Sequence, residues 1–158
     1  GFVVDAALTG LNKNGKVLVT SKEVAEKGAP TFSAWVVTGA FSKENPAFLK
    51  AYAGVIEKYS ISFANDKNAW GPDSDNAKTL AKLLGGTPGD FAAALKNLSL
   101  VPQEVQASDA WLGGGEKSGV ARILKETASF LKEQKKISEV LPSYAAYATP
   151  SALTVLKK

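Results

Sequence analysis

The stretch Gly28-Ala29-Pro30-Thr31-Phe32-Ser33-Ala34-Trp35-Val36-Val37-Thr38 is the point at which the character of the chain changes. Along residues 32–37 successive side chains fall on opposite faces of an extended backbone, a pattern that predicts a β-strand. Pro30 suits the first position of such a strand, where a missing backbone N–H is tolerated. Ser33 is the polar residue inside an otherwise apolar run, so we expect its side chain to face any cleft that the strand lines.

The residues before this stretch alternate between strand-like and helix-like patterns. Residues 1–4 and 16–19 are apolar, β-branched runs that predict short strands. Asp5 begins a helical segment between them, and Thr20 or Ser21 can cap a second short helix. The order strand, helix, strand, helix, strand is typical of an α/β fold, in which the strands usually pair in parallel.

Helical patterns dominate after Thr38. The clearest covers residues 46–64, where large apolar side chains recur at helical spacing behind an Asn45-Pro46 start. Further helices are expected at residues 75–84, from Pro88 onward, within 102–112 and at 116–135. The few predicted strands cannot form a sheet that all these amphipathic helices pack on. The sequence therefore predicts that a partner sheet, and with it part of the fold, is missing.

The composition limits the chemistry that the chain can perform. Its 158 residues are enough for one domain with a hydrophobic core. The absence of His and Cys excludes Cys/His metal sites, thiol nucleophiles and Ser-His-Asp triads, and we expect no metal site and no cofactor. The net charge of +4 arises from Lys residues scattered along the predicted helices and from a single Arg, Arg122. Because nucleic-acid binders cluster their cations, we expect no nucleic-acid partner.

The first residues of the sequence do not resemble the start of a newly translated protein. The sequence contains no Met, so Gly1 is not expected to be a native translation start. The first residues already lie inside an apparent strand. We therefore expect a fragment or a processed product of a longer protein.

Several blocks of sequence follow one another in a recognisable order. They are Val4–Ala7, Gly15–Thr20, Gly28–Val37, Phe41–Pro46, Thr127–Gln134 and Tyr144–Thr149. In this order they resemble the second half of the taurine/aliphatic-sulfonate periplasmic binding proteins. The resemblance covers essentially all 158 residues, and the order of the blocks is more specific than any one of them.

The resemblance implies a fold of two α/β lobes, the type II periplasmic-binding-protein fold, of which this helix-rich chain would supply a part. Residues 1–30 would be the end of the second lobe, and residues 31–38 the strand that crosses the hinge. Residues 39–158 would form the C-terminal helical part of the first lobe. The N-terminal half of that fold would be missing, in agreement with the missing sheet inferred from the helices.

The resemblance also implies a function. The complete protein would be the periplasmic solute-binding component of an ABC importer for taurine, an alkanesulfonate or a related small oxyanion. It would not be an enzyme, and it would present its ligand to the membrane subunits of the transporter. Because helices without their sheet expose an apolar surface, the chain is expected to pair with the missing N-terminal half or to self-associate.

Two of the residues that the resemblance places at the ligand cleft lie near the start of the chain. Asp5 follows the first predicted strand, and it either caps the next helix or contacts a cationic or hydroxyl part of the ligand. Val4 stands where the family often has Trp, which would make the pocket wall smaller or more open.

The other two candidate ligand-binding residues are Thr31 and Ser33. Taurine-selective members of the family carry an acid where this chain has Ser33, and that acid pairs with the ligand's ammonium group. Because Ser supplies no charge, the resemblance implies a sulfonate without an amine, or a related oxyanion. The alternative is a buried structural Ser33 that bonds to neighbouring backbone. Thr31 would place a second hydroxyl near the same cleft.

Two other functions stay open at this point. Carboxylates are numerous enough for a hydrolase that uses two of them, although no pair stands in a suggestive motif. Glu116, Glu126 and Glu133 instead indicate the solvent face of one helix. The chain is alternatively a stable fragment without activity of its own. A product assay separates the hydrolase, which turns over, from a binding protein, which only saturates.

Overall fold

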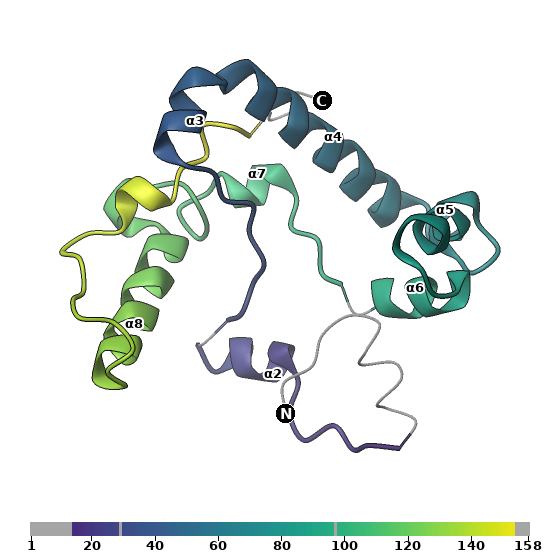
Figure 1. Ribbon diagram of the computed structural model, residues 1–158, viewed down its shortest axis with the longest axis horizontal. Helices are drawn as coiled ribbons and strands as arrows, with labels where there is room; N and C mark the ends of the chain where they lie inside the picture. The colour runs from purple at the N-terminus through teal and green to yellow at the C-terminus, as the bar shows by residue number, and fades with distance from the viewer. Residues whose placement is uncertain (1–13, 29, 97, 154–158) are drawn as a thin grey trace. The chain divides into compact units, whose positions relative to one another are not determined.

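The computed structural model describes residues 14–28, 30–96 and 98–153, and the regular structure within these ranges is helical (Figure 1). The prediction that helix far exceeds strand is thereby confirmed. The strand expected at residues 1–4 and the helix expected from Asp5 lie outside the described residues.

The helices occupy most of the regions in which the sequence predicts them. The α-helices are α2 (Ser21–Glu26), α3 (Gly39–Glu44), α4 (Pro46–Asn65), α5 (Asp75–Leu84), α6 (Pro88–Leu95), α7 (Gln103–Gln106) and α8 (Gly119–Glu133). Short 3-10 helices lie at η1 (Asn68–Trp70), η2 (Gly115–Lys117) and η3 (Ala145–Tyr147). The helix predicted at residues 75–84 has the predicted bounds.

The strands predicted at residues 16–19 and 31–38 are wrong for this chain, because both segments lack regular structure. Figure 1 shows the second of them as a drawn-out stretch between α2 and α3. A strand is defined by hydrogen bonds to a neighbouring strand. Within the described residues no second strand is present to supply them. The two-lobed α/β arrangement is therefore not seen in this part of the chain.

Hydroxyl side chains set the starts of most helices. An N-cap oxygen accepts a hydrogen bond from the backbone N–H three residues ahead, which satisfies a donor that the helix leaves free. The residues that do this are Thr20, Thr38, Ser74, Thr87 and Ser118. α4 begins at Pro46 as predicted, but the Asn45 side chain turns back, and its Nδ2 donates to the Phe41 carbonyl of α3 at 3.1 Å.

Two helices are shorter than the sequence predicts. Only Gln103–Gln106 of the expected 102–112 helix is α-helical. The long helix expected from Glu116 begins at Gly119, so Glu116 lies in η2 rather than on the face of α8. Gly114 and Gly115 have φ of +77° and +58°, a left-handed conformation that turns the chain and delays the helix.

Two compact units divide the chain, and α4 contributes to both. The first unit comprises Gly1–Ser33 and Tyr59–Leu100, and its helices α5 and α6 pack together. Ala77 of α5 is fully buried and Ala92 of α6 nearly so, since small side chains let helices approach closely. Trp70 in η1 sets its ring at a steep angle to Tyr59 and Phe63 of α4, with centroids 6.2 and 6.1 Å away.

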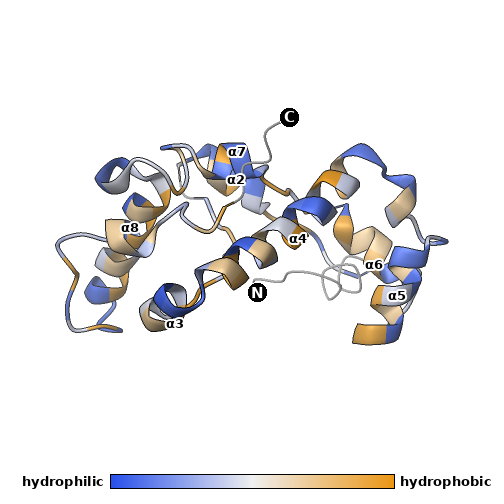
Figure 2. Ribbon diagram, turned by 90° about the horizontal axis from the view of Figure 1, so that it is seen from above, coloured by the Kyte–Doolittle hydropathy of each residue, from blue (hydrophilic) through white to orange (hydrophobic). Residues whose placement is uncertain are grey.

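The second unit comprises Ala34–Lys58 and Val101–Lys158, and its core lies at the start of α8. α8 carries hydrophobic and hydrophilic residues along its whole length, as Figure 2 shows. The buried residues are Val120, Ala121 and Ala148, packed against Trp111, Leu112, Leu124 and Tyr144. The helix expected at residues 116–135 is thus amphipathic as predicted, with its buried residues along one side.

A tight turn joins this core to the segment before it. The backbone N–H of Gly119 donates to the Asp109 carbonyl at 2.8 Å. A Cβ at Gly119 would lie 2.0 Å from the Ala110 oxygen, so only glycine permits this approach. Ser118 beside it is fully buried, donates its hydroxyl proton to the Trp111 carbonyl and caps α8. This turn fixes where α8 starts.

Candidate functional site

The four candidate ligand-binding residues fall into two groups. Val4 and Asp5 lie outside the described residues. Thr31 and Ser33 lie on the irregular stretch between α2 and α3, where both side chains are exposed. Among the described residues neither hydroxyl has a hydrogen-bond partner. In the described part of the chain Ser33 is therefore exposed rather than buried, and both hydroxyls are accessible from solvent.

A shallow hollow lies in the second unit. It is lined by Ser42, Pro46, Leu49, Ser151 and Ala152, and its volume is about 70 Å³. Sites for small molecules usually measure about 300–1,000 Å³ and bury most of the ligand. This hollow contains none of the predicted ligand-binding residues, and its size does not suit an enclosed ligand.

A buried polar contact joins α4 to α7, and sequence analysis missed it. Glu57 is 8 % exposed and Gln103 is 3 % exposed. The Glu57 carboxylate accepts the backbone N–H of Gln103 at 3.5 Å, and Gln103 Nε2 donates to the Ala53 carbonyl at 2.8 Å. Gln103 Oε1 is buried without a hydrogen-bond partner among the described residues. No local pattern marks these residues, because they are 46 positions apart.

This contact serves structure rather than chemistry. Pro102, the N-cap residue of α7, makes no side-chain cap, so the first N–H groups of that helix need acceptors from elsewhere. The Glu57 carboxylate supplies one, and a negative charge is favourable at a helix N-terminus. We therefore assign Glu57 to the attachment of α7 and not to a ligand.

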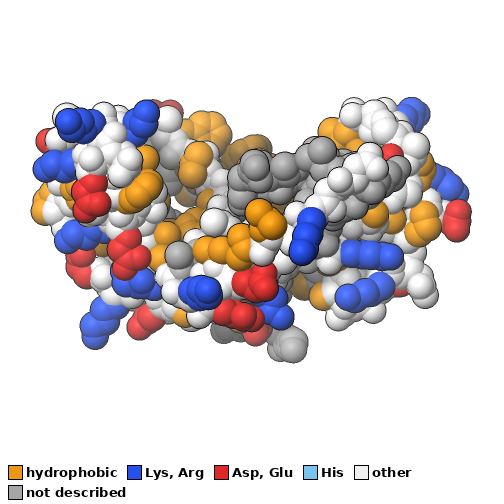
Figure 3. Space-filling view, turned by 90° about the horizontal axis from the view of Figure 1, so that it is seen from below, with side chains coloured by type: hydrophobic (Ala, Val, Ile, Leu, Met, Phe, Trp, Pro, Cys, Tyr) orange, Lys and Arg blue, Asp and Glu red, His pale blue; other side chains and the backbone are white. Residues whose placement is uncertain are grey.

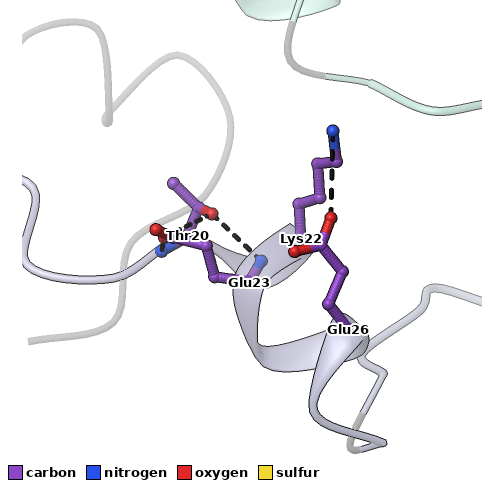
Figure 4. A network of polar contacts seen from close by, with 4 residues as sticks. All are labelled: Thr20, Lys22, Glu23 and Glu26. Carbon is purple, nitrogen blue, oxygen red and sulfur yellow. Dashed lines mark hydrogen bonds and ion pairs between the residues drawn. The ribbon is translucent and has the colours of Figure 1, made fainter.

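A second polar network lies at the start of α2 (Figure 4). The Glu23 carboxylate accepts hydrogen bonds from the Thr20 backbone N–H and hydroxyl, both at 2.7 Å. These bonds, the backbone one first, lower the pKa of Glu23 below its usual value. Lys22 and Glu26 form an exposed i, i+4 ion pair at 4.0 Å, which contributes little stability.

On the face shown in Figure 3, the charged side chains of the described residues form no single patch of one sign. Arg122 is exposed and pairs with Glu126 at 2.9 Å, and Glu126 lies on a solvent face as predicted. Charged and apolar side chains are interspersed on the face of the molecule in Figure 3. Within the described ranges no cluster of three acidic residues could hold a metal ion. No helix in this part of the chain is long and apolar enough to cross a membrane.

One comparison with known proteins gives a clear likeness. The chain matches no protein-family profile. It is 34 % identical, over 150 residues, to the taurine-binding periplasmic protein of Escherichia coli strain K12. The match covers 94 % of this chain and 44 % of the E. coli protein, so the chain spans less than half of that relative's length. This likeness confirms the resemblance inferred from the order of the sequence blocks.

Proposed function

We propose that the chain is part of a periplasmic solute-binding protein that delivers a small oxyanion to the membrane subunits of an ABC transporter. The observation that carries this proposal is 34 % identity along 94 % of the chain to a taurine-binding periplasmic protein. A likeness that extends over almost the whole chain favours a common architecture over a shared local motif.

The described residues are compatible with binding and do not favour catalysis. A chain without His and Cys lacks the most frequent general base, histidine, and has no thiol nucleophile. The carboxylates of Glu57 and Glu23 are engaged in helix capping, and Glu126 pairs with Arg122. Asp90 likewise caps α6, and Glu116 accepts a hydrogen bond from the Ser143 hydroxyl. No observation on the described residues favours the hydrolase alternative.

We place the ligand contacts of this chain at Val4, Asp5, Thr31 and Ser33. Two exposed hydroxyls at Thr31 and Ser33 can donate hydrogen bonds to sulfonate oxygens. A complete pocket needs further residues from the rest of the protein, since a small ligand is usually buried over most of its surface. The chain alone is therefore expected to show no micromolar binding of taurine or of ethanesulfonate.

The ligand class follows from Ser33. Taurine differs from ethanesulfonate by an ammonium group, which loses its hydration on binding. A hydrogen bond between charged partners contributes roughly 1.5–3 kcal/mol, and Ser33 cannot supply the negative partner. We therefore propose that the complete protein prefers an unaminated sulfonate, or a similar oxyanion, to taurine.

The test uses a hybrid protein in which residues 1–158 replace the matched part of the E. coli relative. Calorimetry with ethanesulfonate and with taurine should give saturable binding and tighter binding of ethanesulfonate. Ser33→Asp should shift the ratio of the two affinities towards taurine by about tenfold or more. Ser99→Asp, which adds the same charge at another exposed serine, should leave that ratio unchanged.

Two results would contradict the proposal. A hybrid that folds but binds neither sulfonate would reject the solute-binding function. Tighter binding of taurine, unaffected by Ser33→Asp, would mean that another acid holds the ammonium and that Ser33 does not set selectivity.

A further inference from the structure

Asn14 and Gly15 form an Asn-Gly pair at the beginning of the described chain. Asn14 lies in a turn, and residues 15–19 lead into α2 without regular structure (Figure 1). Every residue from Asn14 to Thr20 is exposed. The pair is therefore accessible to water and lies outside the helices.

An asparagine loses its side-chain amide when the backbone nitrogen of the next residue attacks its Cγ atom. A bond forms between that nitrogen and Cγ, the bond from Cγ to Nδ2 breaks, and Nδ2 leaves as ammonia with the proton of the attacking N–H. Water then opens the five-membered succinimide ring at either carbonyl carbon, which gives aspartate or isoaspartate. The ring closes fastest when the next residue is glycine, because glycine has no Cβ and the widest choice of backbone conformations.

The other asparagines of the described ranges lack this opportunity. In each case the next backbone nitrogen either belongs to a proline ring or already donates a hydrogen bond. These residues are Asn45, Asn65, Asn68 and Asn76. The N–H after Asn68, for example, donates to the Asp66 carboxylate at 3.2 Å, and the N–H after Asn76 donates to the Ser74 hydroxyl at 3.2 Å. The N–H of Gly15 has no hydrogen-bond partner among the described residues.

We propose that Asn14 is a site of spontaneous modification, at which attack by the Gly15 nitrogen converts the asparagine to aspartate or isoaspartate through a succinimide. Among the described asparagines Asn14 alone combines an exposed side chain, a following glycine and a following N–H that is not engaged. The reaction needs only water and no enzyme. The inference goes beyond the proposed function and does not depend on it, since no ligand takes part.

The modification changes the segment that leads into α2. Either product adds one negative charge, and isoaspartate also adds one carbon to the main chain. Residues 16–19 have strand-like side chains, and a strand pairs through regularly spaced N–H and C=O groups. An extra main-chain carbon before them displaces those groups by one atom. The capping box of Thr20 and Glu23 lies beyond this segment, so α2 should keep its first turn.

The test is to incubate the purified chain in mildly alkaline buffer prepared with heavy-oxygen water. Peptide mapping by mass spectrometry should show uptake of the heavy oxygen at Asn14, at least about tenfold faster than at Asn68 or Asn76. Methylation by an isoaspartyl methyltransferase should locate isoaspartate at the same position. In NMR spectra the amide of Gly15 should shift, and that of Thr20 should not.

Two variants separate the effect of the structure from that of the dipeptide. Gly15→Ala should slow the conversion of Asn14 by at least about tenfold, because the added Cβ hinders ring closure. Ala69→Gly places a second Asn-Gly pair at the exposed Asn68, where the next N–H is bonded to Asp66. This second pair should convert at least about tenfold more slowly than Asn14, and Asp66→Ala in the same chain should remove most of that difference.

Conversion of Asn14 that is no faster than conversion of Asn68 and Asn76 in the unaltered chain would overturn the inference. Equal rates at the two pairs of the Ala69→Gly variant would also overturn it, because the structure would then not select the site. Both measurements are made on peptides after digestion, so neither requires that the chain bind a ligand.

Discussion

Two glycines on helices differ completely in the space that surrounds them. A Cβ at Gly119 would lie 2.0 Å from the Ala110 oxygen, and the backbone N–H of Gly119 already bonds to Asp109. A Cβ on Gly54, inside α4, would meet no atom within 4 Å. The first glycine is required by packing, and the second only lowers helix propensity.

Alanine substitutions should therefore have opposite effects at these sites. Gly119→Ala should lower the free energy of unfolding by at least about 2 kcal/mol, because the turn before α8 must open. Gly54→Ala should raise it by about 0.5–1 kcal/mol through helix propensity. Urea denaturation followed by tryptophan fluorescence measures both. Similar losses from the two variants would mean that the close approach at Gly119 is not formed in solution.

The evidence for Ser33 as a ligand contact comes from its sequence context, its exposure and the family resemblance. Its polarity inside an apolar run marked it as a candidate, and its exposed side chain is accessible in the structure. Its relation to a ligand charge follows from the family resemblance and not from any contact within the chain. The Ser33→Asp experiment therefore tests the family argument more directly than it tests the fold.

Among the elements, α2 shows how a short helix is held by its first turn. Thr20 and Glu23 form a capping box, in which each side chain bonds to the backbone of the other. α2 has no buried residue, so this local network is its main support. Lys27 ends the helix, and Gly28 with φ of +90° turns the chain away.

The capping box makes α2 sensitive to acid. Hydrogen bonds from Thr20 favour the ionised carboxylate, so the pKa of Glu23 in the folded state lies below its ordinary value of 4.5. The stabilisation is therefore complete above that ordinary value and is lost as the pH falls through the lower, folded-state pKa. NMR titration of the Glu23 side chain and the Thr20 amide should show both changing together.

A variant at the same position provides the control. Glu23→Gln keeps an acceptor for the Thr20 amide but does not titrate, so the acid-dependent change of that amide should disappear. A Glu23 that titrates at or above its ordinary value would contradict the capping geometry.

At the scale of the whole molecule, the chain leaves an unusual amount of apolar surface uncovered. Leu18 in the first unit is 89 % exposed, and Trp35 in the second unit is 76 % exposed. The described part of the chain has few fully buried apolar residues. Hydrophobic burial is the main stabilising term of a domain. This chain is therefore expected to be weakly stable compared with a domain of the same length that buries its apolar side chains.

The exposed surface should be detectable with a fluorescent dye. The chain at neutral pH without denaturant should bind anilinonaphthalene sulfonate, because that dye reports accessible apolar surface. Phe48→Lys should reduce the dye fluorescence by more than Phe130→Lys does. An absence of dye binding would mean that the apolar side chains are covered in solution.

The sequence by itself determined those features that depend on neighbouring residues. The spacing of apolar residues predicted where most helices lie, and Thr20 and Pro46 predicted where two of them begin, because a helix closes its hydrogen bonds within four residues. The order of the blocks also indicated the family, since that signal lies in the chain and does not need contacts. Thr31 became a candidate ligand contact by the same resemblance, which also supported Ser33, already marked by its polarity within an apolar run.

The tertiary structure decided what depends on distant partners. Residues 16–19 and 31–38 have strand-like side chains but form no strand, because a strand takes its hydrogen bonds from another segment. Glu57 caps α7 because α4 and α7 lie against each other. The apolar stripe of α4 is exposed because no described segment covers it. Side-chain patterns determine which secondary structure a segment favours. The segments available to pair with it determine which secondary structure it forms.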